Sequence, residues 1–301
     1  TVHLVERDTE FGGLGRRLST TLRGGDVRAH AAMLGAAVVR NDRIHVHTGA
    51  QPAVMRGHIG HFELDLSTGV TVHGGVVIVA TGAREHRPAH FGYGDHPRVV
   101  TQLEWEERGG REMPDDGSVV MIQCVGSRVP ERSYCSRVCC AQAVKNALAI
   151  KKKRPRAAVT VLYRDIRTYG LDEESYRAAR EAGVMFLRFE EDRSPDVTHE
   201  GDRLAVVHHD AELGANITLP ADWLVLSTAV EALPENRVLG ETLKVPVMED
   251  GFFLEAHAKL RPVDFASEGI FVAGLAHGPK GVDESIAQAL AAAGRAGIVL
   301  S

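Results

Sequence analysis

The chain has 301 residues, a formal net charge of −5 and an isoelectric point near 6.3. This length suits two domains with sizeable cores, and the slightly acidic balance disfavours binding to nucleic acid or to a membrane surface. No apolar run approaches the length of a membrane span, no signal peptide is visible, and four cysteines without a disulfide framework indicate a reducing, cytoplasmic compartment.

The first residues predict a strand over 2–5 that ends at Glu6. In a dinucleotide-binding domain, the acidic residue that ends the second strand binds ribose hydroxyls, about 20 residues after a G-x-G-x-x-G turn. No such turn precedes Glu6, so we expect the first strand and its turn either upstream of Thr1 or on another polypeptide. An ordinary exposed acid is the alternative for Glu6, and the pair Gly12-Gly13 favours the nucleotide interpretation.

The next segments predict a helix over 26–40 and a short strand over 44–46. Three segments then follow at hairpin-like spacing: HFELDL, TGVTVHG and VVIVATGA. The last of them is an apolar strand that ends in Ala80-Thr81-Gly82. We expect a three-stranded meander that leads into a buried strand, with Gly82 permitting close approach of a ligand to the backbone.

Residues 118–146 carry the strongest chemical signal in the sequence. All four cysteines (Cys124, Cys135, Cys139 and Cys140) lie within seventeen residues, directly after an apolar run and before a segment with helical spacing of apolar residues. The segment is therefore predicted to form a strand, a cysteine loop and a helix. In a dinucleotide-binding domain a glycine-rich turn occupies this place and holds a pyrophosphate on the helix N-terminus.

Four thiolates that converge on one point suit a zinc ion or an iron–sulfur cluster, and a dithiol pair formed by Cys135 and Cys139 is a further option. The spacing C-x10-C-x3-C-C matches neither the usual zinc pattern nor the common ferredoxin runs. Inert buried cysteines are the remaining interpretation. Without a glycine-rich turn at this place, we expect weak or absent NAD(P)H binding.

Two later patterns concern the domain organisation and the basic run 151–156. Residues 203–230 repeat the order of a hairpin followed by an apolar strand, which indicates two domains built on one plan. We place an inserted domain at 114–232 and an outer domain at 1–113 and 233–301. The basic run closes the predicted helix, where cations are favourable, and Pro155 stops it.

The last element predicts a short strand over 269–273, a glycine turn over 274–281 and an amphipathic helix. This arrangement directs backbone N–H groups toward one point. Ser285 and Gln288 fit a capping box at the start of the helix. His277 lies in the turn and is the one histidine of the chain that we single out as a candidate site residue.

Several separate stretches in the same order resemble one family. QCVGSR, YCSRVCC and AVKNA, with RTYG, GFFLEAHAKLRPVD and AGLAHGPKGVDESIAQA, are similar to the A-type subunit of heterodisulfide reductase, an iron–sulfur flavoprotein. The resemblance implies an α/β fold with two dinucleotide-binding (Rossmann-like) domains of the thioredoxin-reductase type, with β-meanders and with the second domain inserted in the first. It also implies FAD in the outer domain and an NAD(P)-binding-like inserted domain that carries the cysteines.

The resemblance further assigns roles to individual residues. The four cysteines would ligate a [4Fe-4S] cluster, and Lys145 of AVKNA would contact the flavin and exchange a proton with it, a solvated lysine being the alternative. Leu275 cannot form a side-chain hydrogen bond, so recognition of the ribityl chain is expected to differ from that in disulfide reductases. The expected FAD contacts are Glu6, Arg7, Gly12, Gly13, Pro52, Thr81, Gly82, Ala83, Gly274, His277, Gly278, Pro279, Ser285 and Gln288.

The expected function is that of an electron-transfer flavoprotein subunit that couples FAD to the cluster, with flavin-based electron bifurcation implied by the resemblance. Its expected partners are other subunits of a heterodisulfide-reductase-like or hydrogenase- or formate dehydrogenase-linked complex and ferredoxin-type carriers, and a homodimer is among the expected assemblies. The family's C-terminal ferredoxin-like domains are not seen in the sequence. Two other functions stay open: an NAD(P)H-dependent dithiol reductase and a zinc-stapled, non-enzymatic scaffold.

Overall fold

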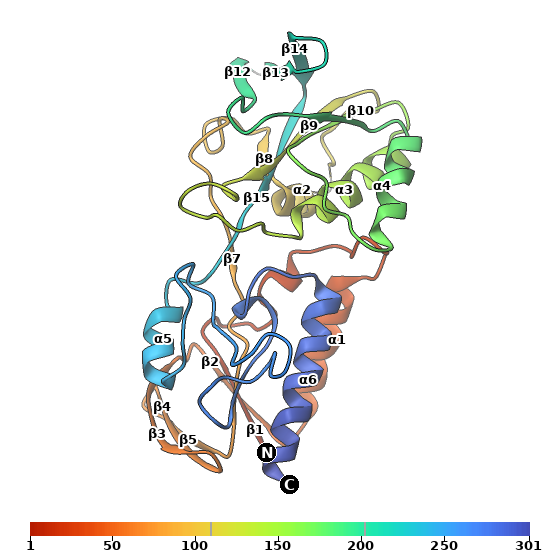
Figure 1. The fold of residues 1–301 in the computed structure, drawn as a ribbon. Coiled ribbons are helices and arrows are strands. Elements are labelled where there is room, and N and C mark those ends of the chain that lie inside the picture. Colours follow the sequence, from red (N-terminus) through yellow and green to blue (C-terminus); the bar gives the residue numbers. More distant parts are fainter. Residues whose placement is uncertain (109, 202) are drawn as a thin grey trace. The chain divides into compact units, whose positions relative to one another are not determined.

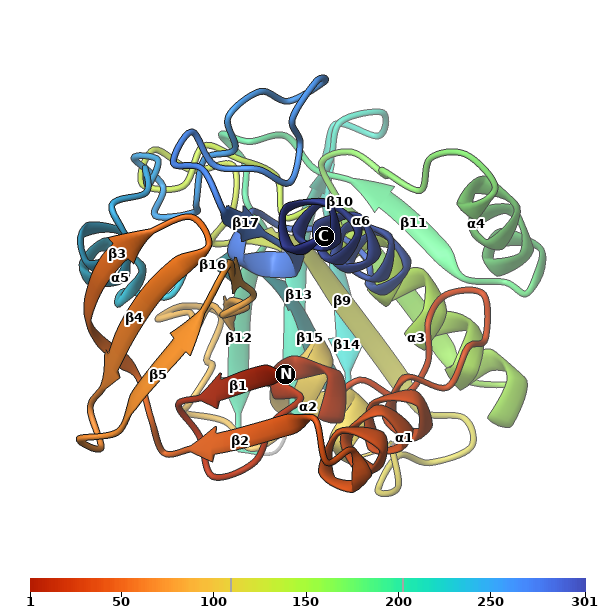
Figure 2. The ribbon, with the colours of Figure 1, turned by 90° about the horizontal axis from the view of Figure 1, so that it is seen from below.

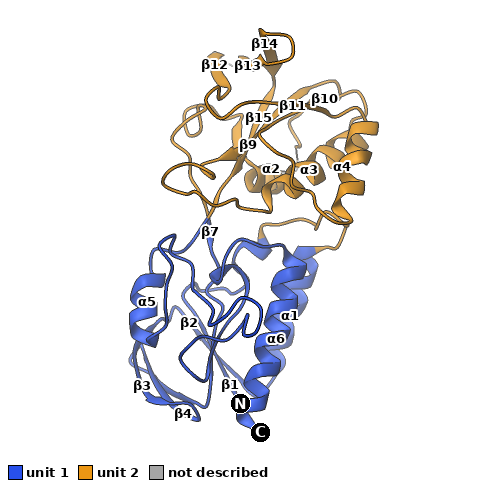
Figure 3. Ribbon diagram, viewed as in Figure 1, with its two compact units in different colours: residues 1–16, 27–84, 231–301 blue, residues 17–26, 85–230 orange. Residues whose placement is uncertain are grey.

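The computed structural model describes residues 1–108, 110–201 and 203–301, and of Glu200 only the backbone. The chain forms two compact units (Figure 3). Unit 1 comprises residues 1–16, 27–84 and 231–301, and unit 2 comprises residues 17–26 and 85–230. Residues 17–26 form a first, short excursion into unit 2; the chain enters unit 2 again at β7 (Arg84–Glu85) and returns at β16 (Val230–Glu231).

The first boundary in the structure differs from the one that the sequence suggested. It lies between residues 84 and 85 instead of 113 and 114. The reason is that β8 (Val99–Thr101) pairs in parallel with β15 (Trp223–Thr228), a central strand of unit 2, with Val100 opposite Val225. A strand of three residues, paired with a segment more than 100 positions away, leaves no local mark in the sequence.

Unit 1 contains three small sheets and three α-helices (Figure 1) among the residues that the structure describes. β1 pairs with β2 and β17 pairs with β6, both in parallel, while β3, β4 and β5 form an antiparallel meander (Figure 2). The core of the unit lies among β6, β17, α5 and the meander and includes Phe253, Phe265 and Val272. The elements are β1 (Val2–Glu6), η1 (Gly13–Arg16), α1 (Val27–Arg40), β2 (Ile44–Thr48), β3 (Pro52–His58), β4 (His61–Leu66), β5 (Thr71–Gly74), β6 (Val77–Val79), α5 (Asn236–Leu243), β17 (Ile270–Val272), η2 (Gly274–Ala276) and α6 (Val282–Leu300).

Unit 2 is built on a five-stranded parallel sheet in the order β11-β10-β9-β15-β8. A second, antiparallel sheet of β12, β13 and β14 belongs to the same unit. The elements, besides β8 and β15, are α2 (Gln102–Arg108), β9 (Ser118–Val125), α3 (Cys139–Lys153), β10 (Ala158–Tyr163), α4 (Asp172–Glu181), β11 (Met185–Arg188), β12 (Asp196–Glu200), β13 (Arg203–Asp210) and β14 (Ala215–Ala221).

The central strand β9 is apolar over most of its length because both faces of the sheet are covered. Val119 and Met121 pack on the side of α3, and Val120 and Ile122 pack on the side of the β12–β14 meander. A parallel strand buried on both faces needs such a run instead of an alternating pattern. Because β9 is buried on both faces, its carboxyl end, where Cys124 lies, is held rigidly. Among the described residues, no helix combines the length and apolar character needed to cross a bilayer.

A candidate thiol site and a candidate cofactor site

The four cysteines lie at the carboxyl end of β9, in the loop that follows it and at the start of α3. Cys124 is the last residue but one of β9 and has a φ of 60°, while Cys139 and Cys140 are the first two residues of α3. Cys135 lies in the loop and is half-buried, whereas the other three are buried. Cys135 therefore lies outside α3, because the helix begins only at Cys139.

The loop between Cys124 and Cys139 is tied back to the central sheet of unit 2. The Tyr134 hydroxyl donates a hydrogen bond to the Val230 carbonyl at 2.9 Å, and the Val230 N–H donates to the Ser136 hydroxyl at 3.0 Å. The loop amide of Arg128 donates to the carbonyl of Tyr134 at 3.1 Å. These bonds return the loop to the strand ends and bring Cys135 back toward Cys124.

Neighbouring thiols contribute to the shifted pKa values of Cys124, Cys139 and Cys140. Burial, followed by the neighbouring thiols Cys140 and Cys135, raises the pKa of Cys124 to about 11. A hydrogen bond with Cys140, together with burial, raises the pKa of Cys139. The same hydrogen bond lowers the pKa of Cys140 to about 7, against the effect of burial and with help from the backbone amide of Arg167. All four thiols therefore form one electrostatic cluster.

The donor chemistry of this cluster fits a thiolate-bound metal centre. Arg137 N–H donates to Cys135 Sγ at 3.3 Å, which is the type of amide-to-sulfur bond that stabilises a bound thiolate. Arg128 lies beside Cys124, where its charge opposes the rise in the pKa of that thiol, and it pairs with Asp165 at 2.6 Å. Among the described residues, however, no three His, Cys, Asp or Glu side chains are arranged to hold a metal ion.

Lys145 is buried on α3 and does not face solvent, which removes the alternative of a solvated lysine. Its Nζ donates to Glu106 Oε1 at 2.6 Å and to the carbonyl of Thr20 at 2.9 Å. Glu106 also accepts from the Ser19 N–H at 2.8 Å and from Gln142 Nε2 at 2.9 Å. The side chains of Lys145 and Glu106 are 8% and 2% exposed, so the pair is a buried ion pair within unit 2.

The predicted FAD contacts in unit 1 gather at the carboxyl ends of parallel strands. Glu6 ends β1 and accepts the Asp8 N–H at 3.0 Å, and Arg7 pairs with Glu235 at 3.7 Å. Thr81 Oγ1 lies 3.4 Å from Asn236 Oδ1. Since Glu235 and Asn236 are neighbours at the start of α5, they bring Arg7 and Thr81 to one place.

Several glycines and short segments among the predicted FAD contacts have conformations that allow a ligand to approach the backbone closely. Gly12, Gly13 and Gly82 all have positive φ, and a Cβ at Gly13 or Gly82 would meet no atom within 4 Å. Pro52 begins β3, and Ala83 directly follows Gly82. The Ala273 N–H donates to the Val79 carbonyl at 2.9 Å, so segment 81–83 and the turn at 274–281 extend from the same ends of β6 and β17.

The turn at 274–281 is held by side chains that the sequence did not single out. Lys280 Nζ donates to the carbonyls of Gly274 at 2.6 Å and Gly278 at 2.8 Å, and Glu255 Oε2 lies 2.8 Å from His277 Nε2. Pro279 directly follows Gly278. The only sequence signal for Lys280 and Glu255 is that they fall within the GFFLEAHAKLRPVD and AGLAHGPKGVDESIAQA stretches.

The capping box expected from Ser285 and Gln288 is wrong. Glu284 takes that role, since its carboxylate accepts the Gly281 N–H at 2.9 Å. Ser285 instead donates its hydroxyl hydrogen bond to the Gly281 carbonyl at 2.8 Å, and Gln288 Oε1 accepts the Gly274 N–H at 2.9 Å. The N-cap is Gly281, four residues before Ser285, because α6 begins at Val282.

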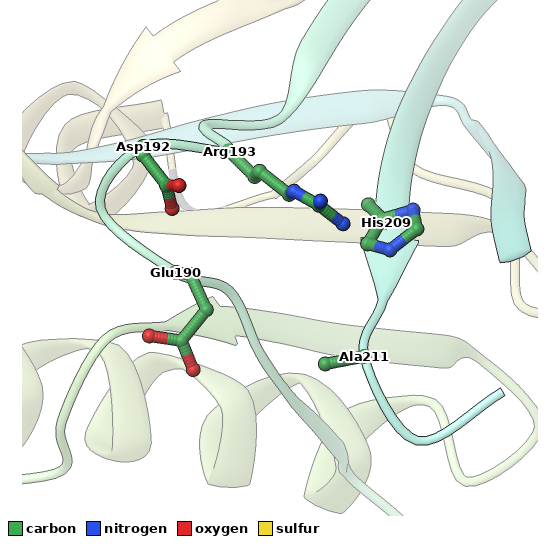
Figure 4. A pocket seen from close by; sticks show the side chains of 5 residues that line it. All are labelled: Glu190, Asp192, Arg193, His209 and Ala211. Atoms are coloured by element: carbon green, nitrogen blue, oxygen red, sulfur yellow. The ribbon is translucent and has the colours of Figure 1, made fainter. Parts of the chain in front are cut away.

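A pocket in unit 2 lies away from all of these residues (Figure 4). It is lined by residues of the segment that follows β11 and by residues at and directly after the end of β13: Glu190, Asp192, Arg193, His209 and Ala211. Arg193 extends toward His209 in the close view. None of the predicted site residues lines this pocket, so it contributes nothing to either candidate site.

Comparison with known proteins gives the family. No family model matches the chain. The A-type subunit of the H(2):CoB-CoM heterodisulfide,ferredoxin reductase of Methanothermobacter thermautotrophicus is 38% identical over 251 residues, which cover 76% of this chain. The A-type iron-sulfur subunit of the CoB--CoM heterodisulfide reductase of Methanocaldococcus jannaschii is 38% identical over 248 residues, which cover 75% of this chain. The chain is a homologue of these heterodisulfide reductase subunits.

The homology to the A-type subunits of heterodisulfide reductase covers only part of those relatives. The matched region spans 37% of the length of each of these two proteins, so the chain corresponds to about a third of such a protein. The resemblance carried by QCVGSR, YCSRVCC and the later stretches is therefore confirmed at the level of the family.

Solved structures show the fold of this heterodisulfide reductase homologue. Thioredoxin reductase from T. acidophilum aligns over all of this chain and 89% of its own, with a TM-score of 0.63 and 13% identity. Thioredoxin reductase from Lactococcus lactis aligns over 99% of this chain and 90% of its own, with a TM-score of 0.62 and 15% identity. The predicted α/β fold of the thioredoxin-reductase type is confirmed.

Proposed function

We propose that this chain is the part of a heterodisulfide-reductase-like protein that binds FAD in unit 1 and a [4Fe-4S] cluster in unit 2. The observation that carries the proposal is the placement of four free thiols at the carboxyl end of β9, in the loop after it and at the start of α3. In a fold of this type that place belongs to a phosphate-binding turn. A relative 38% identical is named an iron-sulfur subunit, which supports a cluster there.

The residues proposed to hold each group come from the two candidate sites. Cys124, Cys135, Cys139 and Cys140 would ligate the cluster, and Arg128 would offset part of its negative charge. The FAD would lie along the carboxyl ends of β1, β6 and β17. When bound, a flavin exchanges two electrons and an iron–sulfur cluster exchanges one at a time, so the pair would connect two-electron and one-electron carriers.

Lys145 is proposed as the residue that exchanges a proton with the flavin. Its ammonium group is held by Glu106 and Thr20, which fix the position of Nζ. Glu106 is thus a positioning residue for Lys145 in this proposal.

The proposed assembly follows the names of the relatives. Those names describe subunits of heterodisulfide reductases that use ferredoxin or hydrogen. We propose that this chain works with other subunits of such a complex and with a ferredoxin-type carrier, and that its flavin bifurcates electrons between them. Cytoplasmic location and a homodimer belong to the same proposal.

Anaerobic spectroscopy tests the proposal. The chain is expected to show a broad visible absorption of a cluster together with flavin bands, and an electron paramagnetic resonance signal after reduction with dithionite. A protein that contains flavin but no iron, and whose flavin bleaches rapidly with NADPH, would instead be a dithiol reductase. One zinc ion per chain without flavin would identify a scaffold.

The dithiol reductase is kept as a second candidate because of one observation. Cys140 has a pKa lowered to about 7 by its hydrogen bond with Cys139, and a thiol with such a pKa is partly ionised and nucleophilic at neutral pH. The same anaerobic spectra separate this candidate from the cluster.

A further inference from the structure

A chain of four hydrogen-bonding groups runs through the turn that precedes α6. Glu255 Oε2 lies 2.8 Å from His277 Nε2, His277 Nδ1 lies 2.9 Å from Gln288 Nε2, and Gln288 Oε1 lies 2.9 Å from the Gly274 backbone nitrogen. All four residues belong to unit 1, and the Glu255 and His277 side chains are only 13% and 23% exposed. Water competes weakly for such half-buried groups.

In this series of hydrogen bonds, the Gly274 N–H determines which group donates and which accepts in every bond. The Gly274 N–H can only donate, so the Gln288 oxygen must accept it, and the other end of that side chain is then the NH2 group. An NH2 group can only donate, so it requires a bare Nδ1 on His277. A neutral imidazole with a bare Nδ1 carries its proton on Nε2, and this proton points at the Glu255 carboxylate, which accepts it.

We infer that Glu255 and Gln288 are positioning residues that hold His277 in the Nε2–H tautomer and thereby fix the turn at Gly274. The carboxylate orients the ring from one side, and the amide donates to the bare nitrogen from the other. A proton placed on Nδ1 would face the NH2 group, so Gln288 would have to turn over and release the Gly274 N–H. The tautomer of His277 and the backbone of the turn are therefore one coupled arrangement.

The meaning of this arrangement for the cofactor rests on the proposed function. Gly274 and His277 lie in the turn that we assign to FAD, and a turn whose amide is already bonded is organised before a ligand arrives. The Gly274 N–H is also taken by Gln288, so the ligand does not receive it. Glu255 thus acts on the cofactor site through His277.

His58 of the same protein provides a comparison for the tautomer of His277. Its Nδ1 lies 2.9 Å from the carbonyl of Ile59, and a carbonyl can only accept. His58 is therefore expected to carry its proton on Nδ1, which is the opposite tautomer to His277.

Nitrogen NMR of the flavin-free protein tests the inference. In long-range proton–nitrogen spectra of histidine-labelled protein above pH 8, His277 is expected to show a bare Nδ1 and a protonated Nε2, with signals identified by their loss in His277→Gln. His58 is expected to show the reverse preference. A protonated Nδ1 on His277, or a shift that averages both tautomers, would overturn the inference.

Three substitutions at two positions distinguish positioning from general stability. Glu255→Gln keeps an acceptor for Nε2–H and is expected to preserve the His277 tautomer, whereas Glu255→Leu removes the acceptor and is expected to mix the tautomers. Gln288→Glu accepts the Gly274 N–H but cannot donate, so Nδ1 should gain a proton. Unchanged His277 shifts in both Glu255→Leu and Gln288→Glu, with circular dichroism intact, would also refute the inference. Flavin content measured on separate samples tests the proposed function independently, because the tautomer is read without flavin.

Discussion

The buried pair of Lys145 and Glu106 shows how single residues determine both stability and the proposed chemistry. Burial alone would raise the pKa of Glu106, but the charge and hydrogen bond of Lys145, with bonds from Ser19 and Gln142, bring it below its ordinary value of 4.5. A carboxyl group whose pKa is lowered on folding stabilises the fold above the unfolded pKa. This contribution is lost as the pH falls below about 4.5 toward the folded pKa.

We predict that Glu106→Gln destabilises the protein by about 3 kcal/mol at pH 7, because it leaves the Lys145 charge buried without a counterion. This difference in the free energy of unfolding should become smaller below pH 4.5, because the carboxyl group of Glu106 in the wild-type protein then takes up a proton. Urea unfolding at pH 7 and pH 4 measures both values.

Glu107 supplies the matched control for this prediction. It is the next residue on α2 and pairs with Arg17 at 2.6 Å, but its side chain is 40% exposed. Glu107→Gln should therefore cost less than about 1 kcal/mol. Equal losses for the two variants would show that Lys145 is not buried with Glu106 as its counterion.

At the scale of the element, the turn after β9 determines where the cysteine loop begins. Gly126 has a φ of 75°, and a Cβ there would lie 2.3 Å from Cδ2 of His86. A side chain at this position meets both a strained backbone and a ring that Arg132 also approaches.

We predict that Gly126→Ala lowers the free energy of unfolding by about 2 kcal/mol or more, since a left-handed backbone costs about 1 kcal/mol and the contact with His86 adds to it. Gly214→Ala is the matched control, because Gly214 has a φ of 62° but open space around its Cβ. Chemical denaturation compares the two. A loss in Gly126→Ala no larger than in Gly214→Ala would show that His86 does not pack against this turn.

The order of strand, cysteine loop and helix was predictable from residues 118–146 because each signal in it is local. The apolar run of β9 and the helical spacing of α3 both lie within a few residues of the cysteines. The path of the loop was not predictable, since it depends on the bonds of Tyr134 and Ser136 to Val230, which is more than 90 positions away. The spacing of residues in the sequence does not predict hydrogen bonds between such distant positions.

The same distinction holds for the candidate cofactor site. Thr81, Gly82 and Gly274 could be proposed from the sequence because they follow apolar strands and resemble known motifs. Glu255 and Glu106 could not, because an acidic residue becomes part of a site only through its partner, and His277 and Lys145 lie 22 and 39 positions away. The prediction of the first domain boundary failed for a similar reason, since β8 joins unit 2 by pairing with the distant strand β15.

At the scale of the whole molecule, the proposed chemistry is divided between the two units. Unit 1 supplies the strand ends and glycine turns that suit FAD, and unit 2 supplies the four thiols and the pair of Lys145 and Glu106. Each unit has its own core, so loss of the proposed cluster should leave unit 1 folded, and loss of the proposed FAD should leave unit 2 folded. The proposed function therefore makes separate predictions for iron and for flavin.

The most direct measurement is the iron and flavin content of anaerobically purified protein and of two variants. We predict about four iron atoms per chain, loss of most of this iron in Cys139→Ser, and full retention in Ser133→Ala, which changes an exposed residue of the same loop. Flavin content should be equal in all three. Iron that stays complete in Cys139→Ser, or a wild-type chain that binds zinc instead of iron, would contradict the central claim that these thiols hold an iron–sulfur cluster.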